Sequence, residues 1–211
     1  ATDLDGDGDM DIVVAEQGSY SEDASSIIWY ENDGRQSFQD HIVTKSVDKV
    51  NDIYVVDLHE DGDNDILSAS RYDNKIALHE NDGNQSFTSH TITTDLNRAI
   101  ALHVADINGD SNLDVLSASR YDDKIAWYEN DGNESFISHT ITTSAISARD
   151  VYAIDMDGDK NMDVLSVNRG EWDGNKYLSK ISWYENDGRE NFTNHVIEKN
   201  LNAAEALFTS D

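Results

Sequence analysis

Short runs of apolar and β-branched residues alternate along the chain with polar segments rich in Asp, Asn and Gly. A typical run is Ile12-Val-Val-Ala15, which follows an acidic segment and precedes a polar one. Runs of this length and composition are typical of strands. No segment has a convincing apolar period of about 3.6 residues, the period that would favour a helix. The pattern therefore predicts an all-β protein.

The runs recur in a fixed order and fall into four kinds. The first kind follows each acidic segment, at residues 12–15, 66–69, 115–118 and 164–167. The second kind lies at residues 27–30, 76–79, 125–128 and 181–184, and each run leads directly into Glu-Asn-Asp-Gly. This sequence predicts a tight turn, because Asn, Asp and Gly tolerate positive φ angles. The third begins at Phe38, Phe87, Phe136 and Phe192, and the fourth lies at residues 53–56, 100–105, 151–154 and 206–208.

These four strands recur with a period of about 50 residues, in repeats spanning approximately 3–56, 57–105, 106–154 and 155–211. Such a period, with turn residues between short strands, predicts the four-stranded antiparallel blades of a β-propeller. Residues 1–211 then form a single propeller domain or a propeller fragment.

The fourth strand of each period immediately precedes the next acidic segment. It therefore belongs to the blade that follows it, and the sequence repeats are offset from the blades by one strand. Three N-terminal strands would be completed by the C-terminal strand at residues 206–208, which closes the ring within one chain. Alternatively, that strand completes the next molecule by strand addition and causes self-association. A third alternative, which we favour, is that the chain is a fragment of a larger propeller.

An acidic segment Asp-x-Asp-Gly-Asp-x-x-x-Asp before a strand, followed by Trp-Tyr-Glu-Asn-Asp-Gly, resembles the FG-GAP and VCBS repeat family. That family includes the propeller heads of integrin α subunits, fungal lectins and large secreted bacterial proteins. The resemblance covers essentially the whole chain, with four copies in phase. It implies the propeller fold and a bound metal, and it says little about the ligand.

Carboxylates at positions 1, 3 and 5 of a tight loop, with a Gly at the bend and a closing carboxylate, resemble the first half of an EF-hand loop and favour calcium. The resemblance implies side-chain ligands at positions 1, 3, 5 and 9 and a backbone carbonyl at position 7. The first site is then Asp3, Asp5, Asp7, Asp9 and Asp11, and the fourth is Asp155, Asp157, Asp159, Asn161 and Asp163. The third is Asp106, Asn108, Asp110, Asn112 and Asp114, and the second retains Asp57, Asp61, Asp63 and Asp65.

The second loop departs from the pattern, because His59 stands at position 3 and Glu60 replaces the Gly at position 4. We therefore expect up to four Ca²⁺ ions, with this site weak or empty. The alternative is that the Asp-rich turns only solvate the surface, as in proteins from salty habitats. If calcium is bound, its expected role is structural, and a chain that depends on it belongs where calcium is millimolar, secreted or at the cell surface.

The composition excludes two classes of partner. The formal net charge is −28, which argues against nucleic acid because phosphate contacts require a basic surface. No apolar run approaches the roughly 18 residues needed to cross a bilayer, so we expect no membrane insertion. The chain contains no Cys, which excludes disulfides and thiolate sites.

The loops opposite the acidic ones contain Arg beside an aromatic residue, a pair that recognises sugars, carboxylates or peptide side chains. The resemblance supports this, because integrin-like propellers bind ligands on the face opposite their calcium loops. The alternative is that each Arg pairs with a nearby Asp and each aromatic packs its loop. The candidate ligand-binding residues are Arg71, Tyr72, Arg120, Tyr121, Arg169 and Trp172.

The recurring Trp and His residues of the strands are interpreted as packing or as a repeated hydrogen bond. No nucleophile or triad spacing is found, so we expect a non-catalytic binding or scaffold module for adhesion or for recognition of a glycan or an extracellular protein. The alternatives are a polysaccharide-degrading enzyme of the lyase type, because some lyases resemble this propeller, and a purely structural repeat within a surface filament.

Overall fold

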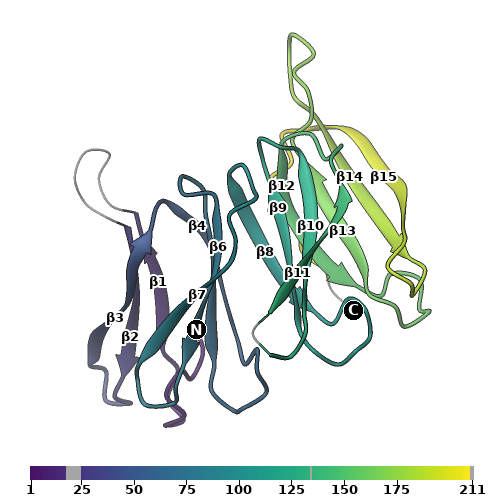
Figure 1. Ribbon diagram of the computed structural model, residues 1–211. Helices are drawn as coiled ribbons and strands as arrows, with labels where there is room; N and C mark the ends of the chain where they lie inside the picture. Colours follow the sequence, from purple (N-terminus) through teal and green to yellow (C-terminus); the bar gives the residue numbers. More distant parts are fainter. Residues whose placement is uncertain (18–24, 134, 210–211) are drawn as a thin grey trace. The chain divides into compact units, whose positions relative to one another are not determined.

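The computed structural model describes residues 1–17, 25–133 and 135–209 of the chain (Figure 1). The chain divides into two units, Ala1–Asp95 and Leu96–Asp211. All regular secondary structure in the described residues is β-strand. The prediction of an all-β protein is confirmed.

The strands lie where the apolar runs predict them. The first unit contains β1 (Ile12–Glu16), β2 (Ser25–Asn32), β3 (Phe38–Val47), β4 (Val50–Val56), β5 (Asp65–Ser70), β6 (Lys75–Asn81) and β7 (Phe87–Thr93). The second contains β8 (Ala99–Ala105), β9 (Asp114–Ser119), β10 (Lys124–Asn130), β11 (Phe136–Thr142), β12 (Ala148–Ile154), β13 (Asp163–Asn168), β14 (Leu178–Asn186) and β15 (Phe192–Asn202).

Neighbouring strands in each sheet are consecutive in sequence and antiparallel, so every sheet is a meander of the propeller-blade type. We number the blades in chain order. Blade 1 is β1-β2-β3, blade 2 is β4-β5-β6-β7, blade 3 is β8-β9-β10-β11 and blade 4 is β12-β13-β14-β15. The predicted four-stranded antiparallel blade is confirmed in blades 2, 3 and 4, while blade 1 has three strands among the described residues.

The prediction of a strand at residues 206–208 is wrong. Residues 203–209 contain no strand, and Phe208 is 91% exposed. The backbone N–H of Leu207 donates instead to Oδ2 of Asp150 at 2.7 Å. A single bond to a side chain replaces the ladder of backbone bonds that a strand needs.

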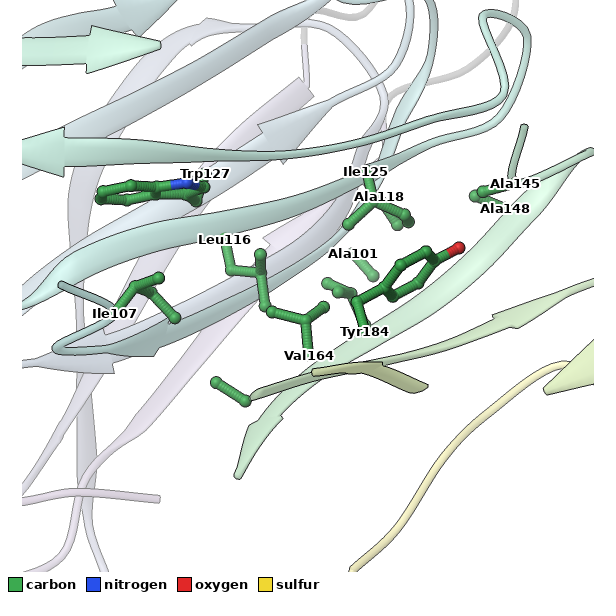
Figure 2. Packing of buried hydrophobic residues seen from close by; sticks show 12 residues of the cluster. Ala101, Ile107, Leu116, Ala118, Ile125, Trp127, Ala145, Ala148, Val164 and Tyr184 are labelled. Carbon is green, nitrogen blue, oxygen red and sulfur yellow. The ribbon is translucent and has the colours of Figure 1, made fainter. Parts of the chain in front are cut away.

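Each unit has its own apolar core, built from the inward faces of its blades. Strands β5, β9 and β13 are inner strands of their sheets and are buried along their entire length. In the first unit, Ile27, Trp29 and Ile66 are at most 1% exposed. Figure 2 shows the cluster of the second unit, where the ring of Tyr184 lies near Ala101 and Val164.

A repeated Trp-His-Glu arrangement joins the last two strands of blades 1, 3 and 4. The indole of Trp127 stacks on the imidazole of His139, with ring centroids 4.3 Å apart. Nε2 of that His lies 2.7 Å from Oε2 of Glu129. The equivalent trios are Trp29, His41 and Glu31, and Trp183, His195 and Glu185. The interpretation of these residues as packing with a repeated hydrogen bond is confirmed.

Candidate functional site

Four acidic loops lead into the strands β1, β5, β9 and β13. We call them loop 1 (3–11), loop 2 (57–65), loop 3 (106–114) and loop 4 (155–163). In loop 4 the first carboxylate, Asp155, accepts hydrogen bonds from the backbone N–H groups of Gly158 at 2.7 Å and Lys160 at 3.1 Å. Asp3 and Asp106 bond in the same way to the fourth and sixth residues of their loops. These bonds curl each loop around its first carboxylate.

The last carboxylate of each loop is buried and joins the loop to the end of the second or third strand of its blade. In loop 1 the two oxygens of Asp11 accept from the N–H of Leu4 at 2.9 Å and of Asn32 at 2.8 Å. Equivalent pairs of bonds are made by Asp65, Asp114 and Asp163. Burial raises the pKa of Asp114 to about 6, although both backbone bonds lower it. The sequence predicted a metal ligand at this position, and this backbone clamp was missed.

The Asn of each Glu-Asn-Asp-Gly turn was also missed as a functional position. In blade 2 the side-chain amide of Asn81 donates to the carbonyl of Asn64 in loop 2 and to the carbonyl of Leu4 in loop 1. Asn186 makes the corresponding bonds to Met162 and Ile107 in the second unit. The recurrence of this Asn in all four Glu-Asn-Asp-Gly turns was the sequence signal that could have identified it. The turn therefore holds its own loop and ties it to the loop of the preceding blade.

The seventh residue of each loop directs its side chain towards the turn glycine. A Cβ atom added at Gly34, which has a φ of +66°, would lie 2.2 Å from Oδ2 of Asp9. Asp63, Asn112 and Asn161 lie in the same way over Gly83, Gly132 and Gly188. The turn glycine thus provides both a positive φ angle and space. Because the side chain at position 7 lies over the glycine, the backbone carbonyl of this residue is the group that can face a cation.

Carboxylates converge in two of the four loops. One oxygen each from Asp3, Asp5 and Asp11 lie within 4.8 Å of one another in loop 1, as do oxygens of Asp155, Asp157 and Asp159 in loop 4. Burial raises the pKa of Asp5, and the nearby carboxylates of Asp7 and Asp11 add to that rise. The candidates Asp7 and Asp163 lie outside these two groups of three. Close carboxylates repel one another unless protons or a cation neutralise them.

Loops 2 and 3 differ from this arrangement at position 3. Nδ1 of His59 lies 3.0 Å from Oδ2 of Asp65 in loop 2. In loop 3 the amide of Asn108 donates to Oδ2 of Asp110 at 3.3 Å. Within the described part of the chain, neither loop brings three carboxylates together as loops 1 and 4 do. The candidates Asp57, Asp61, Asp63, Asp106 and Asp114 are therefore not gathered into such a cluster.

The candidate ligand-binding residues lie at the other end of the blades. There the loop between the second and third strands meets the link that leads into the first strand of the same blade. Backbone N–H groups of Arg71 and Tyr72 donate to the carbonyls of Lys49 and Asp48, so this end is joined by its own backbone bonds. The same pairing occurs for Arg120 and Tyr121 in blade 3 and for Arg169 in blade 4. These bonds are consistent with the prediction that the acidic loops and the candidate binding loops lie at opposite ends of a blade.

The Arg side chains lie against aromatic rings. The guanidinium of Arg71 lies 4.8 Å from the ring centroid of Tyr72, and that of Arg120 lies 5.6 Å from the ring of Tyr121. In blade 4, Arg169 lies 3.8 Å from Tyr177, whose ring packs edge-on against Trp172. Tyr72, Tyr121 and Trp172 are each more than 40% exposed. These loops can therefore offer aromatic faces and cations to a ligand.

Comparison with known proteins gives a family, and solved structures of similar fold. The model of the FG-GAP-like repeat matches residues 3–68, 57–117 and 106–166. No curated protein matches the chain. A solved structure of an Agrocybe aegerita lectin, described by its specific recognition of non-reducing terminal N-acetylglucosamine, is 14% identical. The similarity covers 91% of this chain and 67% of that one, with a TM-score of 0.48. Among the described residues, no helix has the length and apolar character needed to cross a membrane.

Proposed function

Because the chain belongs to the FG-GAP-like repeat family, we propose that it is a calcium-stabilised, secreted or cell-surface module that binds glycans or proteins. The observation that carries this proposal is the convergence of three carboxylates within 4.8 Å in loop 1 and again in loop 4. Carboxylate and carbonyl oxygens are the ligands that calcium prefers in proteins.

The donors of loops 1 and 4 fit a calcium ion. Their side chains offer oxygen only, the closing carboxylate keeps lone pairs beyond its two backbone bonds, and the seventh residue has a carbonyl available. The residues that would hold the ion are Asp3, Asp5, Asp7, Asp9 and Asp11 in loop 1, and Asp155, Asp157, Asp159, Asn161 and Asp163 in loop 4. Bound calcium would neutralise the carboxylates and hold the loop closed, so its role is structural.

The extracellular location follows from the affinity expected of such loops. Extracellular calcium modules bind with dissociation constants of about 10⁻⁴ to 10⁻³ M, which suits millimolar calcium outside the cell. Binding is assigned to the opposite end of the blades, where exposed Tyr72, Tyr121 and Trp172 lie close to Arg side chains. Recognition by aromatic faces and Arg needs no catalytic group.

Thermal unfolding with millimolar calcium or with excess chelator tests this function. At 5 mM calcium, about five to fifty times the expected dissociation constants, two ions would stabilise the fold by about 2–5 kcal/mol. The expected gain in Tm is about 4–20 °C. The variant Asp157→Asn keeps an oxygen that can accept the N–H of Asp159, so it removes a charge while the loop retains its internal bond. It should lose about half of the calcium-dependent gain.

The matched control is Asp173→Asn, which removes an equal charge from an exposed loop of the same blade. It should keep the full calcium response. If the wild-type protein shows the same Tm in calcium and in chelator, the calcium part of the proposal is wrong.

A further inference from the structure

Blade 4 departs from the repeat at the loop between its second and third strands. Blades 2 and 3 have Ser70-Arg-Tyr-Asp73 and Ser119-Arg-Tyr-Asp122, whereas blade 4 has Asn168-Arg-Gly-Glu171 and a longer connection to β14. This connection extends beyond the ends of β13 and β14 as a hairpin (Figure 1). A departure from an otherwise regular repeat is where a specialised site is expected.

Gly170 stands where blades 2 and 3 have Tyr. The equivalence is structural, since the N–H of Gly170 donates to Ile146 just as the N–H of Tyr72 donates to Asp48. A Cβ atom added at Gly170 would lie 2.0 Å from the carbonyl oxygen of Leu178, and the φ angle is +71°. The position therefore requires glycine, because the backbone of Leu178 lies where the side chain of a Tyr would begin.

A hollow of about 180 Å³ lies beside this glycine, within the second unit. Its lining combines aliphatic side chains with an amide, a hydroxyl and one charge of each sign. Besides Gly170, the lining residues are Ser144, Ile146, Asn168, Glu171, Leu178 and Lys180. The volume is well below the roughly 300–1,000 Å³ of pockets for drug-sized ligands, so the space suits one small ring.

Asn168 gives the hollow an unused hydrogen-bond donor. The residue is 1% exposed, and its Oδ1 accepts from the hydroxyl of Ser166 at 3.4 Å. Its Nδ2 atom has no hydrogen-bond partner among the described residues. A buried donor without a partner costs free energy, which a ligand acceptor would recover. In blades 2 and 3 the corresponding residue is Ser, so this amide is specific to blade 4.

We propose that this hollow binds a single neutral sugar ring, which deepens the binding function proposed above and rests on it. A pyranose has apolar faces for Ile146 and Leu178, oxygen acceptors for the amide of Asn168, and hydroxyl groups that both Glu171 and Lys180 can bond. The two charges of the lining offset each other. A net charge of −28 over the chain disfavours uronic acids and sulfated sugars.

Saturation-transfer NMR on the whole chain in calcium tests the site. The probes are the methyl glycosides of glucose, mannose, galactose and N-acetylglucosamine, with glucuronate as the acidic comparison. At least one neutral glycoside should bind, and glucuronate should bind more weakly. Asn168→Ser, which restores the residue of blades 2 and 3, should weaken that binding about tenfold, as expected for the loss of one hydrogen bond.

Ile146→Arg fills the hollow from its partly exposed wall and should abolish binding, while Asp173→Asn should leave it unchanged. If none of the four neutral glycosides binds, or if Asn168→Ser binds as the wild type does, the site is wrong. Binding that survives both substitutions but is lost in Tyr72→Ala overturns this site and leaves the general binding function standing. Calcium-dependent stability is measured separately, so its failure would not be confused with failure of the hollow.

Discussion

At position 3 of the acidic loops the chain has Asp5, His59, Asn108 and Asp157, and this one position separates the loops. An Asp there contributes to a group of converging carboxylates, whereas His59 lies 3.0 Å from Asp65. An imidazole N–H donated to this carboxylate occupies an oxygen that a cation would need. We infer that loop 2 is stabilised by its own side chains in place of an ion.

The double variant His59→Asp, Glu60→Gly gives loop 2 the residues of Asp157 and Gly158 and should create a calcium site. Native mass spectrometry at millimolar calcium should find one more bound ion than in the wild type. Tm in calcium should rise. Tm in chelator should fall, because the bond to Asp65 is lost and a carboxylate now stands at position 3 beside the other carboxylates of the loop, although the net charge is unchanged. An unchanged number of ions would show that position 3 does not decide occupancy.

A second residue-scale prediction concerns His79, which replaces the Tyr found at this position in the other blades. Its ring nitrogens lie 3.0 Å from the hydroxyl of Ser68 and 2.8 Å from that of Ser89. Burial lowers the pKa of His79 to about 4. The folded protein therefore holds it neutral, while the unfolded chain takes up a proton near pH 6.5.

The contribution of His79 to stability is fully present above pH 6.5 and is lost progressively as the pH falls to about 4. The loss approaches about 1.4 kcal/mol per pH unit, or about 3 kcal/mol in total. His79→Tyr, which adopts the residue of Tyr128, should remove this part of the pH dependence. Urea unfolding of both proteins at several pH values between 7 and 4 gives the slope of the free energy of unfolding against pH. The difference between the two slopes isolates His79, because the other titrating groups contribute equally to both proteins. Parallel slopes would mean that His79 titrates alike in the folded and unfolded states.

At the scale of the loop and its neighbouring strand, the buried carboxylate at position 9 matters as much as the exposed ones. Asp163 is 1% exposed and accepts the N–H groups of Met156 and Asn186 at 3.0 and 2.8 Å. Asp163→Asn would set an amide NH₂ group against one of these donors. The free energy of unfolding should then fall by about 1–3 kcal/mol even in chelator.

Asp157→Asn is the matched comparison, because it makes the same change of charge in the same loop. In chelator it should be neutral or slightly stabilising, since it relieves repulsion among carboxylates. Chemical unfolding of the two variants in chelator separates the roles. Equal effects would mean that the backbone clamp at position 9 contributes no more than an exposed carboxylate does.

The sequence predicted the strands well, because β-branched runs separated by Asn-Asp-Gly turns leave little choice of structure. It predicted the acidic residues of the loops by spacing alone, but not which of them bond to the backbone. Asp163 is clamped by Asn186, a residue of the strand that returns after the longest loop, and only folding brings the two together. The apolar run at residues 206–208 suggested a strand, but its N–H at Leu207 bonds to a side chain of Asp150, a contact that the sequence pattern does not reveal. The hollow of blade 4 also depends on loops from two places in the chain.

At the scale of the whole molecule, the charge of −28 offers a competing explanation for any effect of calcium. Forty-three Asp and Glu residues against fifteen Lys and Arg repel one another, and any added salt screens that repulsion over a Debye length of about 10 Å at 0.1 M. A bound ion acts differently, because it contacts carboxylates that lie within 4.8 Å of each other and depends on their geometry as well as their charge.

Matched ionic strength distinguishes the two explanations. Calcium chloride at 5 mM has the ionic strength of sodium chloride at 15 mM and the same ionic strength as magnesium chloride at 5 mM. If calcium binds the loops, Tm should rise by about 4–20 °C in 5 mM calcium and little in sodium. The rise should be smaller in magnesium, because this smaller ion retains its water and demands a stricter octahedral geometry. If the acidic loops are only solvated, magnesium should equal calcium, and sodium chloride at several hundred millimolar should reproduce the gain through screening. If sodium chloride reproduces the gain, the repeated acidic residues are surface charges that suit a salty environment and not metal ligands. The backbone bonds of Asp3 and Asp11 would still account for the shape of the loop.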